Sequence, residues 1–180
     1  MLRLVKPSKE YLPAFLKVID DYRADDNHFG RGEIDSLIKA VDTGTTDEWF
    51  QKTADFDTNT NLPADYVPGT TFWLLDDDEW IGSFNVRHRL TESLEQLGGH
   101  IGANIAPRHR GGYSSFIGIK LCLAQARKLG LDRVLMTCNA NNAASYRAIM
   151  GLVKLYGGEQ IPDSIVGDQA QHRAWVNTPK

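Results

Sequence analysis

The sequence predicts a mixed α/β (α+β) fold, and three patterns indicate this class. A short strand followed by an amphipathic helix opens the chain over residues 2–23. Two β-rich runs joined by an acidic turn are typical of a hairpin over residues 70–86. A strand, a glycine-bearing turn, a helix and a second strand follow over residues 99–138, which is the order of a βαβ unit. We therefore expect a sheet covered by helices.

Composition indicates one globular domain over residues 1–180. The chain has 180 residues, with 20 Lys and Arg against 23 Asp and Glu, for a net charge of −3. A domain of this length buries roughly 70% of its unfolded surface, so it needs neither metal nor disulfide to fold. The slight acidic excess argues against a nucleic-acid partner, because binding phosphates takes a surplus of basic residues.

Cysteine use and hydropathy exclude further classes. Cys122 and Cys138 are too few for a disulfide framework and do not stand at the spacing of metal ligands, so we expect no metal site. Their neighbours are apolar, and we expect both thiols to be inert core groups. The apolar runs are about a strand long, and the N-terminus has no signal-peptide pattern. We expect a cytoplasmic protein with no membrane partner.

The first elements follow from local periodicity. Residues 2–6 alternate as in a strand, and Pro7 and Ser8 end that strand and cap a helix. Apolar residues recur at helical spacing over residues 11–23, so one helix is expected there. A second, short helix is expected over residues 34–41.

Two segments are predicted to be mostly loop. Residues 24–32 are polar and punctuated by glycine, and residues 42–69 are rich in Asp, Asn, Thr and Pro with few periodic apolar positions. Trp49 and Phe50 anchor at most a helical turn in the second segment.

The central third predicts strands. Residues 70–75 and 80–86 form the hairpin, and a polar connection over residues 87–98 leads to a strand over residues 99–106. Pro107 ends that strand, because proline cannot donate to the ladder.

The last third predicts helices alternating with strands. A helix is expected to run from residue 116 to its end at residues 129–130, followed by a buried strand over residues 134–138. Asn142 is expected to cap a helix that ends at Gly151. Closing strands are expected over residues 152–156 and 173–176.

The turn before the helix at residue 116 carries the most chemical information. A strand that leads through glycines into a helix N-terminus directs unpaired backbone N–H groups and the positive end of the helix dipole to one point. Gly111 and Gly112 permit close approach, and Arg108 and Arg110 add charge. The spacing fits neither a Walker loop nor a dinucleotide fingerprint. The turn is either a diphosphate clamp of another kind or simply a tight turn with surface arginines.

The order of these motifs resembles the GNAT superfamily of N-acetyltransferases. That family's core runs strand, proline, an Arg/Gln-x-x-Gly-x-Gly/Ala turn, a long helix, a buried strand, and a helix led by Asn. The matching segments of this chain are residues 104–107, 110–115, 116–130, 131–138 and 142–152. The resemblance is strong over residues 99–152 and loose elsewhere.

The resemblance implies a GNAT acyltransferase fold, with a central, mostly antiparallel sheet that contains a splayed parallel central pair flanked by helices. It implies acetyl-CoA as cosubstrate and direct transfer of the acetyl group to a primary amine of a small molecule or peptide, with no acyl-enzyme and no metal. Because family members often dimerise, a homodimer is a possible state.

The resemblance also implies which residues meet the cofactor. The turn would hold the diphosphate, the strand ending at Ala106 would hold the pantetheine, and the Asn-led helix would face the cofactor. The implied cofactor-binding residues are Asn104, Ile105, Ala106, Arg110, Gly111, Gly112, Tyr113, Ser114, Ser115, Asn142 and Ser145.

Tyr113 departs from the family's pattern. When Arg110 is matched to the family's Arg/Gln, Tyr113 falls at its first glycine. A shift of one residue places Gly112 there instead, with His109 in the Arg/Gln position. Either the turn bulges by one residue or Tyr113 weakens cofactor binding.

Two residues are candidates for proton transfer. Tyr146, on the Asn-led helix, stands near the place where family members carry the Tyr that protonates the coenzyme A thiolate, although the register of Asn142 puts Ile149 there. His100, on the central strand, is a candidate base acting through water. A packed Tyr and a hydrogen-bonded structural His are the alternatives.

The acceptor wall is expected near the end of the first helix. Asp20, Asp21, Asp25 and Asp26 would favour a cationic amine, or they are merely solvated charges. His28 and Phe29 are further candidates for the same wall.

Two other functions stay open. A non-catalytic CoA-binding or regulatory module on the same fold would bind the cofactor without turnover, and a structural or interaction domain would not be stabilised by coenzyme A at all.

Overall fold

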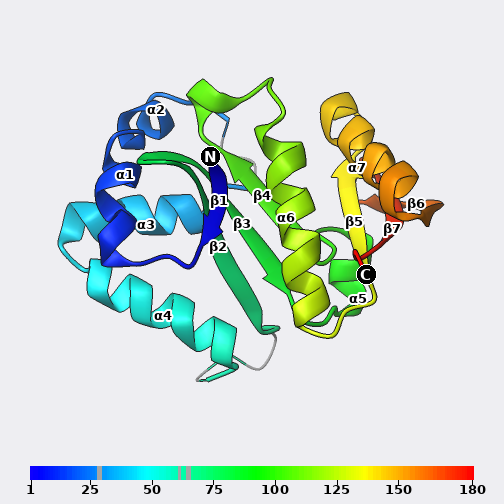
Figure 1. The fold of residues 1–180 in the computed structure, drawn as a ribbon, viewed down its shortest axis with the longest axis horizontal. Coiled ribbons are helices and arrows are strands. Elements are labelled where there is room, and N and C mark those ends of the chain that lie inside the picture. Colours follow the sequence, from blue (N-terminus) through cyan, green and yellow to red (C-terminus); the bar gives the residue numbers. More distant parts are fainter. Residues whose placement is uncertain (28–29, 61, 64–65) are drawn as a thin grey trace.

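A computed structural model describes residues 1–27, 30–60, 62–63 and 66–180. Helices follow the first strand, a hairpin stands in the middle of the chain, and helices and strands alternate from α5 to β6 (Figure 1). In order they are β1 Leu2–Val5, η1 Lys9–Tyr11, α1 Leu12–Leu16, α2 Ile19–Arg23, α3 Gly32–Thr43, α4 Thr46–Thr58, β2 Gly69–Asp76, β3 Glu79–Arg87, α5 Glu92–Gln96, β4 Ile101–Ile105, η2 Pro107–His109, α6 Ser114–Lys128, β5 Arg133–Asn139, α7 Ala143–Tyr156, β6 Gly158–Val166 and β7 Gln169–Asn177.

The strands form two antiparallel sheets. One has four strands in the order β1-β2-β3-β4, and the other has three in the order β5-β7-β6. Figure 1 shows β4 and β5 running in the same direction, each followed by a helix. No ladder joins them, but the His100 N–H donates to the Leu135 carbonyl at 2.7 Å. The mixed fold of a mostly antiparallel sheet flanked by helices is as the resemblance implied.

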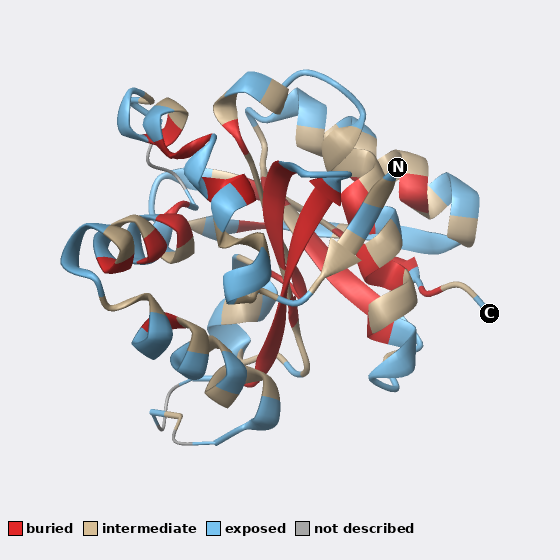
Figure 2. Ribbon diagram, turned by 60° about the vertical axis from the view of Figure 1, so that its left-hand side comes forward, coloured by how far each residue is buried: buried red, intermediate tan, exposed pale blue. Residues whose placement is uncertain are grey.

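Helices cover both faces of the larger sheet. Helices α1 to α4 lie on one side, whereas α6 and α7 lie toward the three-stranded sheet (Figure 1). Along β2, Phe72 and Leu74 join the core under α6, while Trp73 and Leu75 join the core under α1 to α4. Figure 2 shows the central strands as the most buried part of the molecule. The unbroken apolar run of β2 is therefore required by burial on two faces.

The segment over residues 9–23 is divided rather than one helix. A 3₁₀ turn precedes α1, and the chain turns again at Lys17 and Val18, where the Val18 N–H donates to the Phe15 carbonyl at 3.0 Å. This tight turn keeps Phe15, Val18 and Tyr22 fully buried in one core. Periodicity predicted which residues are buried, but it does not detect a turn that preserves the same spacing.

The prediction of loop over residues 42–69 was wrong for its first part. Helix α4 spans 13 residues of it and ends at Thr58, and the next residue, Asn59, has a positive φ of 57°. A narrow stripe that includes Trp49, Phe50 and Phe56 faces the protein, and the Trp49 Nε1 donates to Ser36 Oγ on α3 at 2.9 Å. The stripe is too narrow to stand out in a polar sequence, and packing on α3 stabilises the helix.

The end of α7 also differs from the prediction. The helix continues through Gly151 to Tyr156, so residues 152–156 are helical rather than a strand, and Gly157 follows with a φ of 80°. A Cβ at Gly151 would lie 3.3 Å from the ring of Phe116. The glycine therefore serves close packing of α7 against α6, not termination.

Candidate functional site

The turn between β4 and α6, residues 106–113, has the geometry of an anion site, and we call it the anion turn. Gly111 takes a positive φ of 83°, and open space surrounds the position of a Cβ at both Gly111 and Gly112. Helix α6 begins at Ser114. The first N–H of this helix with a backbone partner is that of Ile117, which donates to the Tyr113 carbonyl at 2.9 Å. The N–H groups of the first turn are thus free to face an anion, with the helix dipole behind them.

Two arginines connect this turn to α2 and to the loop that follows it. The Nη2 of Arg110 lies 2.8 Å from Asp25 Oδ2, and its Nε donates to the Ile105 carbonyl at 3.1 Å. The Nη2 of Arg108 donates to Asp21 Oδ1 at 2.7 Å. These guanidinium groups hold the pKa of both aspartates below its usual range.

Tyr113 does not fill the turn. Its side chain is 81% exposed, and its backbone has φ −86° and ψ −1°, which any L residue adopts. The position therefore does not require glycine, and the positive φ that does require it falls at Gly111.

Strand β4 presents a free edge beside the turn. Hydrogen bonds join Arg87 N to the His100 carbonyl and Ala106 N to the Ile81 carbonyl, at the two ends of the β3–β4 ladder. Backbone groups alternate along an antiparallel strand, so Asn104 pairs with β3 while Ile105 points its N–H to the opposite edge. The N–H of Ile105 is available to a ligand lying along that edge.

A polar cluster that the sequence did not reveal lies on the face of β3 and β4 toward α2 and α3. The Ser83 hydroxyl donates to Glu33 Oε1 at 2.8 Å, and the buried Tyr22 hydroxyl donates to Asn104 Oδ1 at 2.7 Å. Ser83 and Asn104 are partners in the β3–β4 register, so the two hydrogen bonds are adjacent. We call Tyr22, Glu33, Ser83 and Asn104 the Glu33 cluster.

Burial sets the charge state of this cluster. Loss of hydration raises the pKa of Glu33 to about 7, against the lowering effect of the Ser83 hydrogen bond. Burial also raises the pKa of Tyr22, so its phenol stays a neutral donor. An acid in the first turn of a helix is ordinary in a sequence, and only the contact of Glu33 with Ser83 distinguishes it.

Comparison with models of known protein families identifies the family of this chain. The model of the acetyltransferase (GNAT) domain matches residues 2–152. The chain belongs to the GNAT acetyltransferase family. No curated protein matches it in sequence.

Solved GNAT structures share its fold at low identity. The yncA protein of Salmonella typhimurium, solved with its cofactor acetyl-CoA, is 11% identical, with a TM-score of 0.58 over 100% of this chain and 95% of that chain. The spermidine/spermine N-acetyltransferase SpeG of Vibrio cholerae is 14% identical, with a TM-score of 0.56 over 99% and 95%. RimJ of Mycobacterium smegmatis, in complex with CoA-disulfide, is 11% identical, with a TM-score of 0.63 over 98% and 81%.

Of the three residues at the end of β4 that were predicted to meet the cofactor, only one directs its backbone N–H to the free edge. The N–H and carbonyl of Ala106 are engaged by Ile81 and His109, and Ala106 is fully buried. The side chain of Asn104 binds Tyr22 instead. Ile105 alone directs its N–H to the free edge.

His100 holds β4 and β5 together. Its Nδ1 accepts from the Leu135 N–H at 2.9 Å, and its own N–H binds the Leu135 carbonyl. The side chain is buried, and desolvation lowers its pKa to about 4. At neutral pH the imidazole is therefore neutral, with Nδ1 occupied. The contact favours a structural role, and its predicted role as base stays a prediction.

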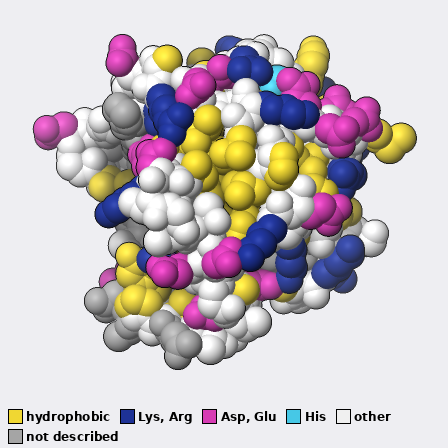
Figure 3. Space-filling view, turned by 90° about the vertical axis from the view of Figure 1, so that its left-hand side faces the viewer, with side chains coloured by type: hydrophobic (Ala, Val, Ile, Leu, Met, Phe, Trp, Pro, Cys, Tyr) yellow, Lys and Arg dark blue, Asp and Glu magenta, His cyan; other side chains and the backbone are white. Residues whose placement is uncertain are grey.

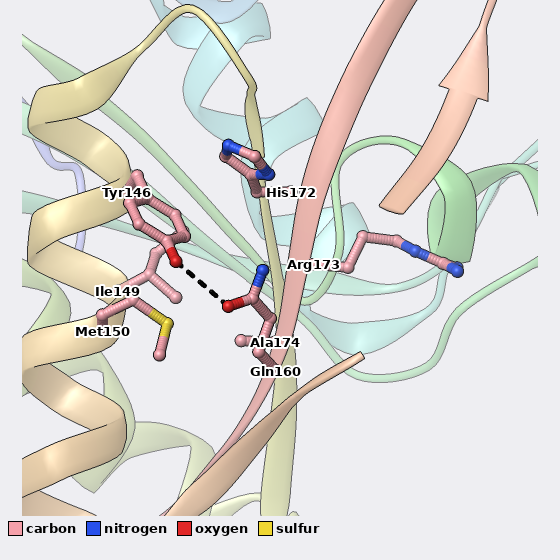
Figure 4. A pocket seen from close by; sticks show the side chains of 7 residues that line it. All are labelled: Tyr146, Ile149, Met150, Gln160, His172, Arg173 and Ala174. Atoms are coloured by element: carbon pink, nitrogen blue, oxygen red, sulfur yellow. Dashed lines mark hydrogen bonds between the residues drawn. The ribbon is translucent and has the colours of Figure 1, made fainter. Parts of the chain in front are cut away.

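Tyr146 points to the three-stranded sheet. Its hydroxyl donates to Gln160 Oε1 on β6 at 3.0 Å, and its ring lies 4.6 Å from that of His172 (Figure 4). The residues around it leave no space for a water molecule. This contact favours the packed-Tyr alternative, and the predicted role as acid stays a prediction.

Asn142 and Ser145 form the cap of α7. The Asn142 Oδ1 accepts from the Ser145 N–H at 3.0 Å, as expected of an N-cap. Ser114 and Ser115 occupy the first two positions of α6, at the turn itself. The cofactor contacts predicted for these four residues stay predictions.

Most of the acidic residues expected on the acceptor wall are paired with arginines. Asp20 binds Arg23 at 2.9 Å, and Asp21 and Asp25 bind the arginines of the turn. In Figure 3, basic and acidic side chains border an apolar area on the face that α1 to α4 form. Paired acids are poor selectors of a cationic amine. His28 and Phe29 lie outside the described residues.

The two cysteines are buried core groups. Cys122 and Cys138 are buried, and burial raises the pKa of both thiols, to about 11 for Cys138. Protonated thiols are weak nucleophiles at neutral pH. Over the described ranges, His, Cys, Asp and Glu side chains form no group of three or more able to hold a metal, and no helix is long and apolar enough to cross a membrane.

Proposed function

We propose that this GNAT chain is an N-acetyltransferase that transfers the acetyl group of acetyl-CoA directly to a primary amine of a small molecule or peptide, with residues 1–180 acting as one domain. The observation that carries the proposal is the open glycine turn at the N-terminus of α6, placed beside the free edge of β4. The cofactor named for the Salmonella typhimurium and Mycobacterium smegmatis structures supports it.

The turn before α6 and the edge of β4 have the groups that acetyl-CoA needs. The turn has room at Gly111 and Gly112, and unpaired N–H groups at the start of α6 would hold a diphosphate with help from Arg110. Acetyl-CoA supplies an acetyl group activated as a thioester. The N–H of Ile105 would donate to a carbonyl oxygen lying along the β4 edge, which stabilises negative charge that develops there.

Transfer to the amine needs no covalent enzyme intermediate. Both cysteines are protonated and buried, and the site brings the two reactants together, which by itself lowers the barrier. The acceptor class stays open between small molecules and peptides, because SpeG is named for spermidine and spermine and the acids expected to attract such cations are paired here. The homodimer also stays a prediction.

The test is the shift in melting temperature with acetyl-CoA. Ligand at about a hundred times its dissociation constant adds roughly 2.7 kcal/mol to the free energy of unfolding. Gly112→Asp places a carboxylate in the turn without a steric clash and should abolish the shift. Gly112→Ala adds only a methyl group in open space and should keep most of it.

A second pair of variants tests the arginines. Arg110→Ala should reduce the shift, whereas Arg108→Ala breaks a comparable ion pair with Asp21 and should reduce it less. If the unaltered protein shows no shift at millimolar acetyl-CoA, the transferase proposal is wrong and the interaction-domain alternative stands. A shift without thiol release on any amine would favour the non-catalytic CoA-binding module.

A further inference from the structure

The Glu33 cluster has a place and a composition that the anion turn does not explain. Its two hydrogen bonds involve Ser83 on β3 and Asn104 on β4, which are partners in the β3–β4 register. Asn104 immediately precedes Ile105 in the chain. The backbone of Ile105 faces the free edge, while the side chain of Asn104 faces α2 and Tyr22. The cluster therefore lines the α2 and α3 side of the strand to which the acetyl donor is assigned.

We propose that Glu33 is the base that takes the proton from the acceptor amine, with Ser83 orienting its carboxylate. This inference rests on the proposed function. The Ser83 hydroxyl occupies Oε1, and Glu33 forms no ion pair with any described residue, so its second oxygen is not engaged by a cation. An ammonium group would supply the missing partner.

The neighbouring arginines already have carboxylate partners, although the buried Nε of Arg31 has no hydrogen-bond partner. Arg31 is buried beside the Tyr22 ring, and its Nη2 donates to Asp35 Oδ1 at 2.9 Å while its Nη1 donates to the Asp25 carbonyl at 2.9 Å. Arg110 binds Asp25, and the Tyr22 phenol is neutral. Glu33 is therefore the carboxylate of this group that is left to exchange a proton.

The ammonium gives one proton to the Glu33 carboxylate, which becomes a carboxylic acid, and the neutral nitrogen forms the C–N bond. The C–S bond breaks with its electron pair on sulfur, and the second proton lost by nitrogen goes to that thiolate. Glu33 returns its proton to water. Because burial brings its pKa to about 7, both forms are populated near neutral pH, as a base in turnover requires.

The experiment uses two acceptors of matched shape and different basicity. Ethylamine is almost fully protonated at pH 7, whereas 2,2,2-trifluoroethylamine is almost fully neutral and needs no base. Thiol release from acetyl-CoA is followed at high concentrations of each amine. Glu33→Gln should slow release with ethylamine by about 10²- to 10⁴-fold and release with trifluoroethylamine by less than about tenfold.

Three controls make the result specific. Glu33→Gln should keep the melting shift with acetyl-CoA, because Glu33 is not part of the turn. Glu48→Gln, at an exposed acid in the first turn of α4, should leave both rates unchanged. Ser83→Ala should move the acid limb of kcat to higher pH, because loss of a hydrogen bond to the carboxylate raises its pKa.

The outcomes separate the two proposals. An equal loss of rate with both amines, or no loss with either, would overturn the role of Glu33 while the transferase proposal stands. If the unaltered protein binds acetyl-CoA but releases no thiol with either amine, the transferase proposal fails and the role of Glu33 fails with it.

Discussion

The ionised carboxylate of Glu33, which the proposed reaction needs, lowers the stability of the folded protein. In the unfolded chain its carboxyl would ionise with an ordinary pKa of 4.5, but in the folded chain burial raises that pKa to about 7. The folded state therefore binds more protons than the unfolded state between these two values. Stability from this residue is greatest below pH 4.5, falls as the pH rises, and reaches its minimum above about pH 7.

Glu33→Gln should therefore stabilise the protein at alkaline pH. The amide removes the charge from this half-buried position and still accepts from Ser83, so we expect a gain of about 1 to 3 kcal/mol at pH 8 that shrinks toward pH 5. Urea unfolding at the two pH values measures it. Glu48→Gln, at an exposed site, is the control and should change little. A loss of stability at pH 8 would show that the ionised carboxylate is favoured where it stands.

At the scale of elements, the contact between β4 and β5 depends on His100. No ladder joins these strands, and the imidazole supplies the acceptor for the Leu135 N–H, which lies in the core. A buried N–H without a partner is costly, so the side chain replaces the strand pairing that is lost where the strands part.

Replacing His100 should reveal this role. His100→Asn places an oxygen near the position of Nδ1, whereas His100→Phe leaves the Leu135 N–H unpaired. We expect His100→Phe to lose about 1 to 3 kcal/mol more in the free energy of unfolding than His100→Asn. Chemical denaturation at pH 7 measures the difference. Normal stability of His100→Asn together with a collapse of thiol release would support the catalytic role predicted for His100 from sequence.

For the whole molecule, ion pairs connect α2 and the loop after it with the anion turn. Asp21 binds Arg108 and Asp25 binds Arg110, across 87 and 85 residues of sequence. These contacts hold α2 and the loop after it against the turn. They also place the Asp25 carboxylate close to the position assigned to a diphosphate.

Asp25→Asn should therefore tighten acetyl-CoA binding. Removing one negative charge at this range is expected to lower the dissociation constant about two- to five-fold at low salt, and less at high salt. Isothermal titration calorimetry at two salt concentrations measures it. Asp21→Asn, at the neighbouring ion pair, is the matched control and should have a smaller effect. Weaker binding by Asp25→Asn would mean that Asp25 holds Arg110 in its binding position.

Much of the fold could be read from local patterns. The hairpin of β2 and β3, the strand β4 that stops before Pro107, and helix α6 after the glycine turn all stand where the sequence predicted. Each depends on neighbours a few residues apart, through side-chain alternation, helical spacing and the conformational freedom of glycine. The order of these elements also carried the resemblance to the family, to which the match over residues 2–152 assigns the chain.

Other features were decided by contacts distant in sequence. Helix α4 depends on packing against α3, and Gly151 is a packing position against Phe116 rather than a helix end. The Glu33 cluster joins residues separated by 50 and 82 positions, and no periodicity signals a hydrogen bond across that distance. The sequence alone determined the β2–β3 hairpin, strand β4, helix α6 and the glycine turn between them, because these follow from local backbone preferences. The tertiary structure decided which polar groups are buried together, because desolvation acts only where distant segments meet.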